Sequence, residues 1–172
     1  FKEPGDRVAL LGPDAVSLGG SEYLWTLHRK LAGRLAPLDL DLERTAQEAC
    51  RAAIEAGLVR SAHDCSEGGL TVAVAEACVS GPAAIGAEIG LPAASRPDLA
   101  LFGEGPSRII VSVPADASPQ HPSRWAGRLD PSLRSGEGRG HGGRTGCPIP
   151  AGRPDPTAIP AKTVISGQHC GL

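Results

Sequence analysis

An abrupt change in composition near Pro114 limits which part of this 172-residue chain can build a hydrophobic core. Val, Ile, Leu, Phe, Trp and Tyr supply 32 of the first 114 residues, or 28%, but 8 of the last 58, or 14%. Glycine and proline supply 18 of those last 58 residues. A segment with so little apolar surface cannot offset the conformational entropy that folding removes. We therefore expect one ordered domain over residues 1–114 and a low-complexity, disordered tail over residues 115–172.

Two hypotheses account for the tail. Its Arg, Gly, Pro, Ser and Ala residues are encoded by GC-rich codons, so an out-of-frame translation of a GC-rich gene is the preferred explanation. A real flexible extension is the alternative. The chain also contains no methionine, which favours an excised fragment or a truncated reading frame.

Charge, hydropathy and cysteine spacing point away from several classes of protein. The net charge of −2 and the pI near 6.2 do not suggest nucleic-acid or membrane binding. No apolar run approaches the length of a membrane span, and the amino terminus does not resemble a signal peptide. The five cysteines are widely spaced and form no CxxC pair, which is typical of reduced thiols in a cytoplasmic protein.

Hydrophobic periodicity divides the first 114 residues into strands and helices. Short apolar or alternating runs predict strands over residues 7–12, 58–63, 85–89 and 108–113. Apolar residues at helical spacing predict three helices, the first capped by Ser21, the second over residues 42–56 and the third from Leu70 to Cys78. This order predicts an α/β fold with a layered mixed sheet, covered by helices on at least one face.

The first candidate site is the segment 61–70, Ser-Ala-His-Asp-Cys-Ser-Glu-Gly-Gly-Leu, which joins a predicted strand to a predicted helix. A carboxylate beside a glycine pair can hold a metal ion or meet a phosphate through backbone N–H groups. Asp64, Ser66, Gly68 and Gly69 are therefore candidate phosphate-binding residues, and Asp64 is also a candidate metal ligand. The structural alternative, given equal weight, is that Ser66 caps the helix and the glycines permit a tight turn.

A second glycine pair stands at the start of the first predicted helix. Gly19, Gly20 and Ser21 are candidate phosphate-binding residues, because open N–H groups at a helix start suit an anion. Glu22 opposes direct phosphate contact unless a cation intervenes. The alternative, which has the larger prior, is that these glycines are structural.

A third candidate segment, Leu-Phe-Gly-Glu-Gly-Pro-Ser-Arg over residues 101–108, leads into the most strand-like run of the chain. Glu104 can accept a hydrogen bond from a substrate hydroxyl or amide, and Arg108 can pair with a phosphate. The alternative, favoured from the residues alone, is an exposed turn with a surface Glu–Arg pair of little energetic weight. No nucleophile–base pair is visible, so no catalytic residue is predicted.

Taken together and in this order, the three segments resemble the last domain of the large subunit of the phosphoribosylformylglycinamidine synthase family. That family belongs to the aminoimidazole ribonucleotide synthetase-like superfamily, and the resemblance covers residues 1–114. It implies a three-layer α/β carboxy-terminal domain that is incomplete at its end, because the family continues beyond Val113 with a further helix and strands. Glu104 and Ser107 stand where the first half of the family enzyme has a substrate-contacting Glu-Ser-Gln stretch.

The resemblance also implies an activity for the intact enzyme. The family uses ATP and magnesium to activate the formyl amide oxygen of formylglycinamide ribonucleotide, and ammonia from a glutaminase partner then displaces phosphate. The implied partners are the remaining domains of the synthetase subunit, the glutaminase subunit and a small accessory subunit, with no nucleic acid and no membrane. The catalytic histidines of the family lie in segments absent here, so His63 is not equated with them and the chain is expected to be inactive alone.

Two alternative functions stay open. One keeps the fold but changes the reaction, as in other ATP-dependent relatives of aminoimidazole ribonucleotide synthetase; the Gly-Gly-Ser-Glu-Tyr run over residues 19–23 argues against it. The other is a non-catalytic interaction module with a flexible basic tail.

Overall fold

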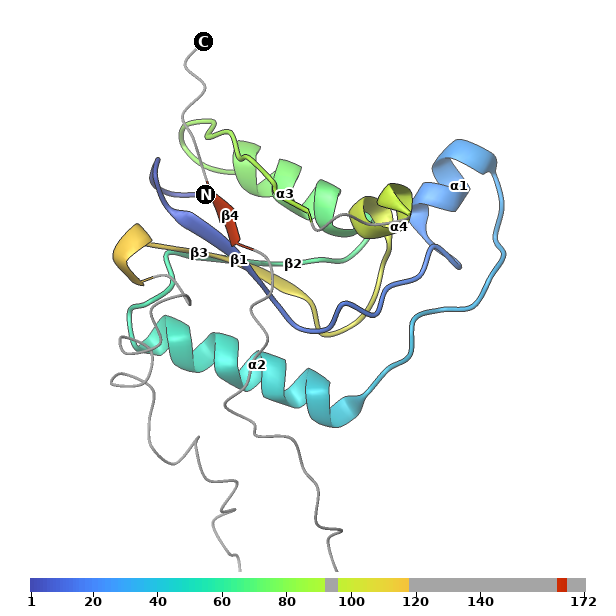
Figure 1. The fold of residues 1–172 in the computed structure, drawn as a ribbon, viewed down its shortest axis with the longest axis horizontal. Coiled ribbons are helices and arrows are strands. Elements are labelled where there is room, and N and C mark those ends of the chain that lie inside the picture. Colours follow the sequence, from blue (N-terminus) through green and yellow to red (C-terminus); the bar gives the residue numbers. More distant parts are fainter. Residues whose placement is uncertain (92–95, 118–163, 167–172) are drawn as a thin grey trace, which may run out of the picture.

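A computed structural model of the chain describes residues 1–91, 96–117 and 164–166. The described residues form a four-stranded sheet with helices on both of its faces (Figure 1). The elements in chain order are β1 (Arg7–Leu11), α1 (Glu22–His28), α2 (Leu40–Glu55), β2 (Ser61–Asp64), α3 (Gly69–Val79), α4 (Pro97–Phe102), β3 (Ile109–Val113), a short 3-10 helix (Ala115–Ala117) and β4 (Val164–Ser166). Within these residues no helix is both long and apolar enough to cross a membrane.

The strand order is β2-β3-β1-β4, and each of these neighbouring pairs is antiparallel. β1 and β2 run in the same direction, as strands linked by a helical crossover usually do, but β3 lies between them. β3 thus lies inside the sheet, and its Val111 is opposite both Ala9 of β1 and Ala62 of β2.

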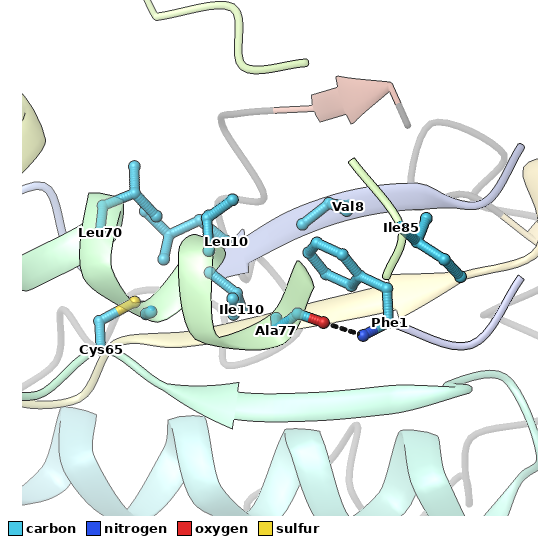
Figure 2. Close-up of a cluster of buried hydrophobic side chains, with 10 residues drawn as sticks. Phe1, Val8, Leu10, Cys65, Leu70, Ala77, Ile85 and Ile110 are labelled. Atoms are coloured by element: carbon cyan, nitrogen blue, oxygen red, sulfur yellow. Dashed lines mark hydrogen bonds between the residues drawn. The ribbon is translucent and has the colours of Figure 1, made fainter. Parts of the chain in front are cut away.

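Alternation along the strands builds a separate hydrophobic core on each face of the sheet. On the α3 face the buried side chains are Phe1, Val8, Leu10, Cys65, Leu70, Ala73, Val74, Ala77, Ile85 and Ile110 (Figure 2). On the α2 face they are Ala9, Leu11, Cys50, Val111 and Val113. The expected α/β class, with a sheet layered between helices, is therefore confirmed, although each described strand pair is antiparallel and the sheet was expected to be mixed.

The second predicted helix is present as α2, and both of its ends carry local signals. α2 starts at the N-cap Asp39, whose carboxylate accepts two backbone N–H groups, and ends before Gly57, which has a left-handed φ of +67°. The first helix ends sooner than its apolar spacing suggests. Arg29 adopts a left-handed φ of 52° and closes α1 before Leu31, so that residue lies outside the helix.

Two predictions about elements were wrong. Residues 85–89 form no strand, although Ile85 is buried, because the segment packs on the α3 core and bonds to it only through the Ile85 N–H and the Cys78 carbonyl among the backbone bonds described. The helix α4 was not predicted at all. Most of the predicted tail lies outside the described residues, apart from the 3-10 helix and β4, and the division at residue 114 stays a prediction.

Candidate functional site

The side chain of Glu104 lies where the first two glycine segments meet. Its Oε1 atom accepts the backbone N–H of Glu22 at 2.8 Å and the backbone N–H of Gly68, also at 2.8 Å. Glu22 is the first residue of α1, and Gly68 is the residue that precedes α3. One carboxylate oxygen therefore bonds the starts of two helices that are far apart in the sequence.

The backbone around Glu104 is held tightly in place. Glu104 and Ser17 form an isolated antiparallel bridge in which each N–H bonds the other residue's carbonyl at 2.9 Å. On either side, a Cβ added to Gly103 would lie 2.4 Å from the carbonyl oxygen of Leu99 in α4, and a Cβ added to Gly105 would lie 2.6 Å from that of Ala15. The two glycines are thus required for the close approach that carries the carboxylate to the helix starts.

Ser21 caps α1 as predicted. Its side chain is fully buried, its Oγ accepts the N–H of Leu24 at 3.3 Å, and its hydroxyl donates to the carbonyl of Leu18 at 2.6 Å. Because both capabilities of the hydroxyl are used inside the protein, Ser21 shapes the turn rather than offering its side chain to a ligand.

The glycines before Ser21 serve a close approach of two chain segments. A Cβ at Gly19 would lie 2.2 Å from the carbonyl oxygen of Arg34, and the Gly20 N–H bonds the carbonyl of Ala32 at 3.0 Å. The segment that follows α1 therefore packs back against the turn at Gly19 and Gly20. These residues help to line a shallow hollow of about 450 Å³, whose wall comprises Val16, Ser17, Leu18, Gly19, Leu24, Ala32, Gly33, Arg34, Arg96 and Leu99.

The turn before α3 also depends on left-handed glycines. Gly68 and Gly69 have φ values of +78° and +68°, and a Cβ at Gly69 would lie 2.7 Å from the carbonyl oxygen of Gly103. The expected alternative role of Ser66 is wrong, because the N-cap of α3 is Gly68 and no side chain caps this helix. The carboxylate of Glu104 satisfies one of the open N–H groups instead.

Asp64 and Ser66 lie exposed at the end of β2 and interact with each other. The Ser66 hydroxyl donates to the Asp64 carboxylate, and this hydrogen bond holds the pKa of Asp64 below its usual value. No group of three His, Cys, Asp or Glu residues with metal-binding geometry occurs in the described ranges. The candidate metal ligand therefore stands as a single carboxylate.

Ser107 points away from Glu104 and toward α2. It is buried, adopts a φ of +64°, and its hydroxyl donates to the carboxylate of Glu43. This link between the start of β3 and the first turns of α2 had no signal in the sequence, because Glu43 reads as an ordinary acidic residue near a helix start.

Arg108 lies in the interior, with 6% of its surface exposed. Its Nη1 donates to the carbonyl of Gly103 at 3.3 Å, and its buried Nε has no hydrogen-bond partner among the residues described. Burial lowers the pKa of this guanidinium, and burial raises the pKa of the adjacent Cys65 thiol. The expected alternative of an exposed turn with a surface Glu–Arg pair is therefore wrong.

An aromatic contact that the sequence analysis missed attaches α1 to α4. The rings of Tyr23 and Phe102 are stacked with their centroids 5.0 Å apart. Both residues belong to the predicted segments, and their aromatic character was the available signal.

Of the predicted candidates, the turn at Gly19, the turn at Gly68 and Glu104 come together; the side chains of Ser107 and Arg108 turn inward.

Comparison with known proteins identifies relatives of one kind. Residues 3–127 match the family described as AIR synthase related protein, C-terminal domain. The chain is 56% identical over 135 residues to phosphoribosylformylglycinamidine synthase subunit PurL of Synechococcus sp. (strain JA-3-3Ab), covering 73% of this chain and 17% of that protein. It is 53% identical over 117 residues to the same subunit of Trichormus variabilis, covering 66% of this chain and 15% of that protein. The chain thus spans about a sixth of the length of these relatives.

Two solved structures have a similar fold. T. maritima PurL complexed with FGAR matches with a TM-score of 0.54 and 25% identity, over 69% of this chain and 21% of that chain. T. maritima PurL complexed with AMPPCP matches with a TM-score of 0.50 and 24% identity, over 70% and 19% respectively, which supports the fold alone.

Proposed function

Because the chain belongs to the AIR synthase related protein family, in which it corresponds to the C-terminal domain, we propose that it works as the matching part of a phosphoribosylformylglycinamidine synthase in purine biosynthesis. The identity of 56% to a PurL subunit is the observation that carries this proposal. The chain spans 17% of that subunit. We therefore assign the activity to a longer protein and expect this part to be inactive alone.

In the proposed reaction, ATP phosphorylates the formyl amide oxygen of formylglycinamide ribonucleotide. Ammonia then attacks the activated carbon, and phosphate leaves with the oxygen. No group of three His, Cys, Asp or Glu residues that could hold a metal ion occurs among the described residues. The magnesium that accompanies ATP is therefore assigned to other parts of the intact enzyme, and no step is derived through it.

This part contributes a scaffold for nucleotide-handling turns. The turns at Gly19 and Gly68 are proposed to face the nucleotide or phosphate, with Glu104 holding both in position. The guanidinium of Arg108 is buried, bonds the carbonyl of Gly103 and interacts electrostatically with Asp14. Ser107 and Arg108 act from inside the protein.

An exposed apolar surface supports contact with the remaining domains of the synthetase. Large apolar side chains stand exposed along α1 and the segment that leads to α2, namely Trp25, Leu27, Leu31, Leu35, Leu38 and Leu40. Figure 1 shows this segment running around the outside of the helices. A surface of this kind marks a protein contact. The glutaminase subunit and the small accessory subunit are proposed as the further partners of the assembled enzyme.

A chimeric enzyme tests the proposed function. The segment of the Synechococcus relative that matches this chain is replaced by residues 3–127, and ATP-dependent amidation of formylglycinamide ribonucleotide is measured beside the unaltered relative. Retained amidation supports the proposal. A folded chimera that turns over ATP with a different substrate would favour another ligase of the superfamily, and a folded chimera without turnover would favour a purely structural module.

A further inference from the structure

The Oε1 atom of Glu104 is placed where a ligand anion would otherwise satisfy open backbone groups. The first N–H groups of a helix have no partner within it, and the positive end of the helix favours a negative charge. At α1 the group satisfied is the N–H of Glu22, and before α3 it is the N–H of Gly68. Hydrogen bonds to a charged acceptor are roughly twice as strong as neutral ones.

α1 has few other attachments to the domain. It contains seven residues, and none of them is buried. Its described contacts with the rest of the domain include the Glu104 carboxylate, the Tyr23–Phe102 stacking, an electrostatic interaction of Tyr23 with Arg96 and the bonds of the turn that precedes it. A helix this short is unstable without tertiary contacts. The carboxylate is therefore one of a small number of contacts that keep α1 in place.

We infer that Glu104 is a positioning residue that couples the turn before α1 to the turn before α3, so that loss of its carboxylate loosens both turns together. The consequence for ligand binding rests on the proposed function, because both turns are the ones proposed to face the nucleotide. The coupling itself rests on the two hydrogen bonds and is measured without any nucleotide.

Glu22 allows the α1 bond to be removed without touching Glu104. Proline at the first helical position is well tolerated, and its missing N–H is the donor in question. Ser21 has φ −77° and ψ 157°, which is the region that a residue before proline prefers. The matched control is Glu22→Ala, which keeps the N–H and loses the same side chain, including its bond from Thr26.

Amide hydrogen exchange, read residue by residue by NMR, is the measurement. In Glu22→Pro the amides of Trp25 and Arg29 should exchange roughly tenfold faster than in Glu22→Ala, because a charge-assisted bond is worth about 1.4 kcal/mol or more. The Gly68 amide should stay protected in both variants. Equal exchange of the α1 amides in the two variants would overturn the inference.

Variants of Glu104 test the coupling from its other side. Glu104→Ala should speed exchange at both Gly68 and Arg29, whereas Glu104→Gln, which keeps an oxygen acceptor, should restore much of the protection. The neighbouring exposed Glu67→Ala should change neither. An effect of Glu104→Ala on one turn alone would overturn the coupling. If Glu104→Ala also makes the Val111 amide of β3 exchange rapidly, the whole domain has unfolded in that variant. The comparison of Glu22→Pro with Glu22→Ala then tests the inference by itself. If the chimeric enzyme is inactive while the exchange results are as predicted, the proposed function is contradicted and the coupling through Glu104 is not.

Discussion

α1 and α3 begin in the same way but are stabilised differently. Each has a glycine pair at its start, and at each start Glu104 bonds an open N–H group. α3 buries five residues against the sheet, namely Gly69, Leu70, Ala73, Val74 and Ala77, whereas α1 buries none. The comparison shows that a local start signal yields a firmly packed helix only where the following apolar stripe meets a core.

The largest difference between the two helices is expected from truncating one leucine in each. Leu70 in α3 is 1% exposed, so Leu70→Ala should lower the free energy of unfolding by about 2–5 kcal/mol. Leu27 in α1 is 62% exposed, so Leu27→Ala should change it by less than about 0.5 kcal/mol. Denaturant titration measures both, and comparable losses would contradict the contrast.

Alanine substitution at two separate glycines with nearly equal φ values should give the next largest effect. Gly57 and Gly69 have φ values of +67° and +68°, but an added Cβ meets nothing within 4 Å at Gly57 and lies 2.7 Å from a backbone oxygen at Gly69. Gly57→Ala should cost about 1–2 kcal/mol for the left-handed conformation alone. Gly69→Ala should cost at least about 1 kcal/mol more, because backbone must shift. Equal unfolding free energies would show that the α3 start is not tightly packed.

Separating the Tyr23 and Phe102 rings should affect α1 and leave α3 nearly unchanged. Replacing either ring by leucine keeps an apolar side chain and removes the stacking, so a double-mutant cycle should give a coupling of about 0.5–1.5 kcal/mol. Amide exchange should accelerate at Arg29, while the Ala73 amide in α3 stays protected. A coupling near zero would mean that the rings do not attach α1.

The smallest effect concerns the acid sensitivity of α4, which lies between the two helices. Arg96 donates to both oxygens of the Asp98 carboxylate, and these hydrogen bonds lower the pKa of Asp98 to about 2. A depressed pKa stabilises the fold above the ordinary value of 3.8, and this stabilisation is lost as the pH falls toward 2. Wild type should therefore exceed Asp98→Asn in stability at neutral pH, by a small margin that vanishes near pH 2. An NMR titration of the Asp98 carboxyl that gives an ordinary midpoint would contradict this.

Sequence reasoning predicted what local chemistry determines. The cap Ser21 and the strand before Pro114 follow from residue type and spacing, and both were found where expected. The alternation over residues 85–89 was misleading, because an extended segment lying on a core has the same period of burial as a paired strand. α4 has six residues, too few to show a helical period.

The candidate site was predicted only in outline. Glu104 was expected to accept hydrogen bonds, but its donors are backbone N–H groups 36 and 82 residues away, and no local pattern specifies such partners. Arg108 was expected to pair with a phosphate or, as the favoured alternative, to lie in an exposed turn, whereas only 6% of its surface is exposed. Its position depends on the carbonyl of Gly103 and on the tertiary packing around it.

The central claim is that a single carboxylate bonds the starts of both helices. Scalar couplings across hydrogen bonds, measured by NMR on the unaltered chain, test it most directly. The account predicts that the amide nitrogens of Glu22 and Gly68 both correlate with the side-chain carboxyl carbon of Glu104. Couplings from these two nitrogens to different acceptor carbons would contradict it.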